Sequence, residues 1–96
     1  MKISNLHFDL YKRAFHKWGA NDQLNMVIEE CAELIHAISK YRRGKPNSLL
    51  DEMADVEIML EQMRVLVGEK DCKIVDSIKM QKIARLNRRV NEEIPL

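Results

Sequence analysis

Residues 24–63 read LNMVIEECAELIHAISKYRRGKPNSLLDEMADVEIMLEQM, and this stretch decides the fold. On both sides of Gly44-Lys45-Pro46, apolar residues recur every three or four positions, which is the period of an amphipathic helix. Glycine and proline together end a helix, so the stretch predicts two helices joined by a short loop. Helices with a short connection pack antiparallel. The fold therefore begins from a helical hairpin.

The same signals predict two more helices. Gly19 is a stop signal after the first periodic segment, and Pro95 follows the last one. No segment alternates at period two over a useful length, so we expect no strands. The expected helices run from about Ser4 to Trp18, from a cap at Asn21 or Asp22 to about Arg43, from a cap at Asn47 or Ser48 to near Gly68, and from Asp71 to about Asn91. The prediction is an all-α, four-helix bundle-like unit in one domain over residues 1–96.

Composition narrows the class of protein. The chain has 96 residues, of which 46% are hydrophobic and 32% charged, as in globular proteins. Its net charge of +1 gives no reason to expect a nucleic-acid partner or an anionic membrane. Neither a signal peptide nor a membrane-spanning run is recognisable. Cys31 and Cys72 have no metal-type spacing and indicate free thiols, so we expect a cytoplasmic protein.

Acidic residues interrupt the apolar stripe of the third expected helix. At about 100° per residue, Glu52 projects within about 40° of apolar positions such as Val56 and Met59. Asp55 lies about 60° to one side, one turn along the same face. By contrast, Glu57 and Glu61 are predicted on the opposite, solvent-facing side. Burying a carboxylate costs several kcal/mol unless it is neutralised, so the position of Glu52 requires an explanation.

The second helix carries a related set of acids. Glu30 lies at the edge of an apolar stripe, with Glu33 about 60° further out, beside Glu29. Two antiparallel helices would bring Glu30 and Glu33 close to Glu52 and Asp55. Unpaired carboxylates repel one another, and Mg²⁺ or Mn²⁺ relieves this because hard cations take oxygen ligands. The alternative is that these are ordinary exposed acids paired with lysines.

The two motifs resemble the signature of the MazG-like all-α nucleoside triphosphate pyrophosphatases. The signature joins Glu-Glu-x-x-Glu on one helix to Glu-x-x-Asp on the next. Here it reads Glu29-Glu30-Cys31-Ala32-Glu33-Leu34 and Glu52-Met53-Ala54-Asp55-Val56. The flanks are also similar, with Gly19 and Gln23-Leu24 before the first motif, Arg43-Gly44 between the motifs, and a basic last helix, Lys79-x-x-Lys82-x-x-Arg85-Leu86-x-x-Arg89.

The resemblance implies Mg²⁺-dependent hydrolysis of a nucleoside triphosphate between its α and β phosphates. It also implies a homodimer or homotetramer whose pockets draw on more than one subunit. Carried onto this sequence, Glu30, Glu33, Glu52 and Asp55 become metal ligands. Glu29 becomes either a further ligand, through water, or a base that orients the attacking water. The five acids together form the expected catalytic set.

Substrate-binding residues are expected on the last and first helices. Lys79 lies inside the apolar stripe of the last helix with Lys82 about 60° away, so both could meet triphosphate oxygens. The alternative for Lys79 is a packed stem with its ammonium in water. Arg85 is a further candidate, or else a solvated or interface residue. Trp18 could stack on a base or belong to the core.

Two other readings stay open. Glu33-x-x-His36 matches the di-iron motif of ferritin-like bundles, but the expected second Glu-x-x-His is replaced by Glu52-x-x-Asp55. The chain could also be an inactive helical module that binds nucleotide or another protein.

Overall fold

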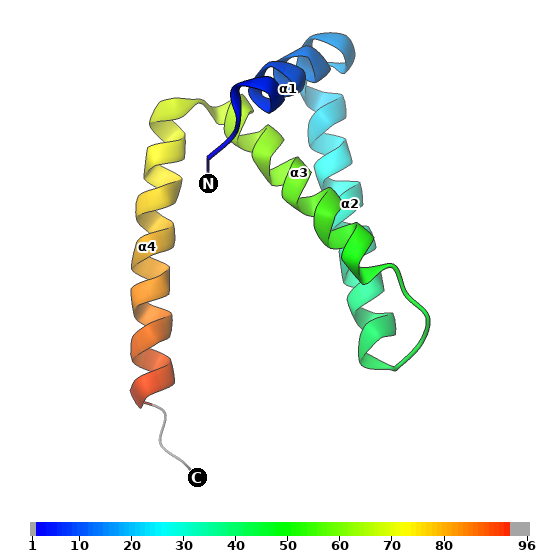
Figure 1. The fold of residues 1–96 in the computed structure, drawn as a ribbon, viewed down its shortest axis with the longest axis vertical. Coiled ribbons are helices and arrows are strands. Elements are labelled where there is room, and N and C mark those ends of the chain that lie inside the picture. The colour runs from blue at the N-terminus through cyan, green and yellow to red at the C-terminus, as the bar shows by residue number, and fades with distance from the viewer. Residues whose placement is uncertain (1, 93–96) are drawn as a thin grey trace. The chain divides into compact units, whose positions relative to one another are not determined.

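The computed structural model describes residues 2–92, and these residues contain four helices and no strand. The helices are α1 (Asn5–Trp18), α2 (Ala20–Arg42), α3 (Leu49–Val67) and α4 (Glu69–Glu92) (Figure 1). The predicted all-α class is therefore confirmed. Over residues 2–92, no helix combines the length and the apolar character that crossing a bilayer requires.

The chain divides into two compact units, Met1–Leu66 and Val67–Leu96. The first unit contains α1, α2 and nearly all of α3, and the second contains α4. Within the first unit, α2 and α3 run in opposite directions and meet at Glu30, Glu33 and Glu52, and α1 crosses the end where α2 begins and α3 finishes (Figure 1). The helical hairpin predicted from residues 24–63 is thus confirmed. The packing of all four helices into one bundle stays a prediction.

Single glycines make two of the helix connections. Ser4 caps α1 by accepting a hydrogen bond from the His7 backbone nitrogen at 3.1 Å. Gly19, with a φ of 85°, ends α1 and directly precedes α2. The predicted cap at Asn21 or Asp22 is therefore wrong. The positive φ of Gly19 lets the chain change direction within one residue, so that α2 begins at Ala20. Asp22 therefore lies in the first helical turn, where its charge favours the helix dipole.

A glycine with a positive φ also sets the start of α4. Gly68 has a φ of 93°, and the helix begins at Glu69 instead of the predicted Asp71. The connection before α3 follows the prediction more closely. Asn47 accepts a hydrogen bond from the Leu49 backbone nitrogen at 3.0 Å, and Ser48 is the last residue before the helix.

The interior of the first unit is small and partly polar. Its buried residues are Tyr11, Ala37 and Met59, together with Gln23 and Gln62. On α2, the innermost positions Gln23 and Ala37 lie seven residues to either side of Glu30, on one line of the helix. Glu30 was expected at the edge of the apolar stripe, pointing into the bundle, and it lies on this inner line. The packed face of α2 is therefore rotated from the one that hydrophobicity alone predicts.

Tyr11 links α1 to α3. Its hydroxyl donates a hydrogen bond to Oε1 of Glu61, and Glu61 is half-buried. The expectation that Glu61 faces solvent is wrong, because Tyr11 from α1 packs against that side of α3. Glu57, by contrast, is exposed as predicted. Burial and the neighbouring Glu61 carboxylate together raise the pKa of Tyr11 from 10.0 to about 12.

Tyr11→Phe is expected to lower the free energy of unfolding at neutral pH by about 2 kcal/mol, since a hydrogen bond to a charged partner is lost. Urea unfolding measures the change. Tyr41→Phe, at an exposed position, is the matched control and should leave the midpoint unchanged.

The pH dependence of this difference has a definite sign. Because the folded pKa of Tyr11 is raised, the stabilisation is complete below pH 10.0 and is lost as the pH rises through about 12. The difference in the free energy of unfolding between the wild type and Tyr11→Phe should therefore disappear in strong alkali. Equal midpoints at neutral pH would contradict the role given to Tyr11.

Candidate functional site

Three acids from two helices form a cluster in the first unit. Glu30 and Glu33 of α2 and Glu52 of α3 each offer one carboxylate oxygen, and these oxygens all lie within 4.8 Å of one another. Glu30 and Glu33 share a face because they are three residues apart, and the antiparallel α3 brings Glu52 opposite them. The structure therefore brings together three of the four residues predicted as metal ligands.

Asp55 adjoins this cluster. Its carboxylate is half-buried and is close enough to raise the pKa of both Glu30 and Glu52. It lies one helical turn after Glu52, as the sequence predicted. Asp55 can therefore complete the set of carboxylates, either directly or through a water molecule.

The electrostatics of the cluster are unfavourable without a cation. Burial, followed by repulsion from Asp55, Glu33 and Glu52, raises the pKa of Glu30 above its ordinary value of 4.5. Burial also raises the pKa of Glu52, with the Ser48 hydroxyl opposing the shift by donating a hydrogen bond at 3.2 Å. Each of these pKa shifts shows that the charged form is under-compensated.

Two carboxylate oxygens in the cluster have no partner. Oε2 of Glu30 and Oε2 of Glu52 are buried and accept no hydrogen bond. These oxygens lack the lysine partners that the ion-pair alternative requires. Burying charged oxygen without compensation is costly, so a cation bound between α2 and α3 would stabilise both side chains.

The dimensions of the cluster suit a divalent cation after a small adjustment. Mg²⁺ holds oxygen ligands at about 2.1 Å, so opposite ligands lie about 4.2 Å apart. The three oxygens spread over as much as 4.8 Å. Rotation of the flexible glutamate side chains is enough to close this gap. Carboxylate oxygens are hard ligands that suit Mg²⁺ and Mn²⁺, and Mg²⁺ would fill its remaining positions with water or substrate phosphate oxygens.

Glu29 and Trp18 lie beside a different feature. Both line a pocket of about 610 Å³ whose residues come from the end of α1, the first half of α2 and the second half of α3. Glu29 is exposed and stands outside the group of three acids. Trp18 is 53% exposed, so its alternative as a core residue is wrong. The other residues of this pocket are Asp22, Gln23, Asn25, Met26, Met59 and Gln62.

Gln62 and Met59 were missed as site residues. Their spacing in the sequence could have identified them, because Gln62 follows Asp55 by seven residues and Met59 follows Glu52 by seven. Positions seven apart lie on the same helix face. The face of α3 that carries Glu52 and Asp55 therefore also carries Met59 and Gln62, which line the pocket.

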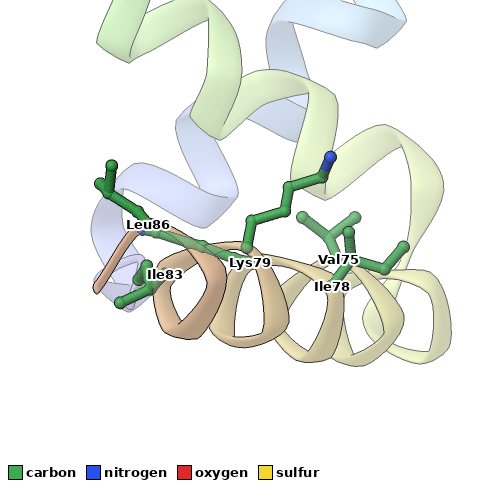
Figure 2. A pocket seen from close by; sticks show the side chains of 6 residues that line it. Val75, Ile78, Lys79, Ile83 and Leu86 are labelled. Atoms are coloured by element: carbon green, nitrogen blue, oxygen red, sulfur yellow. The ribbon is translucent and has the colours of Figure 1, made fainter. Parts of the chain in front are cut away.

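The predicted phosphate-binding residues lie on α4, in the second unit. Lys79 and Lys82 line a hollow of about 410 Å³ with Val75, Ile78, Ile83 and Leu86. Figure 2 shows the Lys79 side chain extended away from the helix, with Ile83 and Leu86 on one side and Val75 and Ile78 on the other. Arg85 is exposed on the same helix. Contact of these cations with a substrate stays a prediction.

His36, the residue on which the di-iron reading depends, is exposed and is not part of the acid cluster.

Compared with protein-family models, with curated proteins and with solved structures, the chain has no significant match.

Proposed function

We propose that this protein is a Mg²⁺-dependent nucleoside triphosphate pyrophosphohydrolase of the MazG-like type. It converts an NTP or dNTP to the monophosphate and pyrophosphate. The observation that supports the proposal best is the meeting of Glu30, Glu33 and Glu52 across α2 and α3. These residues occupy positions of the two acidic motifs, and two of them carry buried oxygens without partners.

The chemistry adds water across the anhydride between the α and β phosphates. Glu30, Glu33, Glu52 and Asp55 would hold the cation. When bound, Mg²⁺ would neutralise phosphate oxygens and lower the pKa of a bound water. Glu29 is exposed and adjacent in sequence to the cluster, so its carboxylate is available to orient the attacking water and accept its proton. Lys79 and Lys82 are proposed to balance the triphosphate charge.

The test is product analysis. The protein is incubated with each common NTP and dNTP plus Mg²⁺, and pyrophosphate and orthophosphate are measured separately. We expect pyrophosphate and monophosphate in equal amounts. Orthophosphate as the primary product would show cleavage at a different anhydride. No product from any nucleotide, together with no Mg²⁺ binding by calorimetry, would contradict the proposal. That result would favour the alternative of a non-catalytic helical module.

We also propose that the working form is a homodimer or homotetramer. Ile35 of α2 is 68% exposed and Leu50 of α3 is 79% exposed, while α4 contains no buried residue. A small chain with this much uncovered apolar surface is stabilised by association with further copies. Sedimentation equilibrium at micromolar concentration checks this, and a monomer mass would contradict it. Cys31 and Cys72 are not joined to each other in a disulfide, which suits the reducing cytoplasm that we propose as its location.

A further inference from the structure

The pocket beside the acid cluster is built from all three helices of the first unit. Trp18 comes from the end of α1, Glu29 is one of five contributors from α2, and Met59 and Gln62 come from α3. Its volume of about 610 Å³ is typical of sites that hold a small organic molecule. The size therefore suits one heterocyclic ring system with its attached sugar.

The polar lining selects against phosphate. Two carboxylates, from Asp22 and Glu29, and three amides, from Gln23, Asn25 and Gln62, face the space, and no Lys, Arg or His belongs to the described lining. Carboxylates repel anions and accept hydrogen bonds without donating them. The pocket therefore fits an uncharged group that carries N–H donors.

The apolar lining suits a flat ring. Trp18 is available for stacking, and Met26 and Met59 add polarisable surface. The Lys17 ammonium stands over the Trp18 ring, 5.1 Å from its centroid. An exposed cation–π contact contributes about 0.5–1 kcal/mol, whereas base stacking contributes about 1–3 kcal/mol. A stacking base can therefore displace Lys17.

Gln62 supplies an independent sign of a ligand. Gln62 and Gln23 are only 8% and 6% exposed, and Oε1 of Gln62 is buried without a hydrogen-bond partner. Leaving a buried polar atom unpaired costs about 1–3 kcal/mol. The terminal torsion of glutamine is soft, so its amide can turn to present either its oxygen or its nitrogen to the pocket. A bound base would supply the missing partner.

The pocket and the acid cluster are close enough for one nucleotide to reach both. Met59 and Gln62 follow Asp55 by four and seven residues, which is about 6 and 10 Å along the helix axis. On the antiparallel α2, Met26 and Gln23 precede Glu30 by the same intervals. A ribose and its first phosphates can bridge such a separation.

We propose that this pocket binds the nucleobase of the substrate and prefers bases with an exocyclic amino group, such as cytosine and adenine, over their keto counterparts, uracil and hypoxanthine. Because it names the substrate of the proposed reaction, the inference rests on the proposed function. An amino group donates to the Asp22 carboxylate, as acidic side chains accept from cytosine N4. A keto oxygen in the same place would face the Asp22 carboxylate, which cannot donate a hydrogen bond to it.

The experiment compares substrates that differ only in this group. For CTP against UTP, and for ATP against inosine triphosphate, kcat/KM of pyrophosphate release should favour the amino member about tenfold. Asp22→Asn, at an exposed position, should bring both ratios close to one. Asp51→Asn is the matched control, because Asp51 is also an exposed acid in the first turn of a helix but does not line this pocket, and it should keep the ratios.

A second readout needs no turnover. Trp18 is the one tryptophan of the chain, so its fluorescence reports on this pocket. Cytidine, which carries no phosphate, should quench Trp18 at about a tenth of the uridine concentration, and Asp22→Asn should remove the difference.

The two proposals fail in different ways. Quenching by cytidine without pyrophosphate from any nucleotide would keep the base pocket and overturn the hydrolase. Pyrophosphate release with amino-to-keto ratios near one, unchanged by Asp22→Asn, would overturn the base preference and keep the hydrolase. Equal quenching by cytidine and uridine would also overturn the preference.

Discussion

Glu52→Gln should lower the rate of pyrophosphate release by more than about a hundredfold while the protein stays folded. The amide keeps the shape of the side chain and its contact with Ser48, but it removes one charge from the cluster. Loss of that charge weakens the binding of a cation between α2 and α3. It also relieves the repulsion among Glu30, Glu33 and Asp55, so the metal-free variant should unfold at the same or a higher temperature than the wild type.

Glu57→Gln is the matched control for this variant. Glu57 is an exposed glutamate on the same helix and lies outside the acid cluster, so its variant should keep wild-type turnover. Steady-state kinetics together with far-ultraviolet circular dichroism separate loss of chemistry from loss of fold. Wild-type turnover in Glu52→Gln would show that the metal has been placed wrongly. An unfolded variant would instead show that the Glu52 carboxylate is needed for the fold itself.

Mg²⁺ should strongly stabilise the protein at neutral pH. At about one hundred times its dissociation constant, a ligand that binds only the folded state adds about 2.7 kcal/mol to the free energy of unfolding. For a chain of this size, that corresponds to a rise in Tm on the order of 10 °C. Thermal unfolding in EDTA and in Mg²⁺ measures the rise, and Glu52→Gln should show a much smaller one.

The response to pH follows from the pKa shifts in the cluster. The folded pKa values of Glu30 and Glu52 lie above the ordinary 4.5, so the folded state holds these protons more tightly than the unfolded state. Stability of the metal-free protein should therefore fall as the pH rises from 4.5 through the raised pKa values, and recover on acidification. The stabilisation by Mg²⁺ should shrink as the pH is lowered through the same interval, because protons and metal compete for the carboxylates. A Mg²⁺ effect independent of pH, and equal in Glu52→Gln, would remove the cluster as the binding site.

Helical periodicity accounts for what was predicted correctly about the candidate site. Glu30 and Glu33 are three residues apart on one helix, and Glu52 and Asp55 repeat the spacing on the next. An antiparallel hairpin with a short loop leaves few ways to pair them. The resulting cluster could be anticipated because both the helix period and the loop length are local properties of the sequence.

Apart from the two helix starts that follow glycine turns, the errors arose where one residue depends on another far along the chain. Glu61 was expected in solvent, and only the packing of α1 brings Tyr11 to it, fifty positions away. The inner line of α2 contains Gln23, Glu30 and Ala37, although the most apolar stripe lies beside it. Hydrophobicity measures which face can be buried, but the partners available in this chain decide which face is buried.

The sequence by itself determined the four helices, most of their ends and the gathering of the acids, since backbone hydrogen bonds, caps and glycine turns act over a few residues. Only the tertiary structure decided the Tyr11–Glu61 contact, the burial of Gln23 and the pocket between Trp18 and Gln62. These features depend on how far one helix slides and rotates against another. Side chains distant in sequence set that register through packing, and no local pattern contains it.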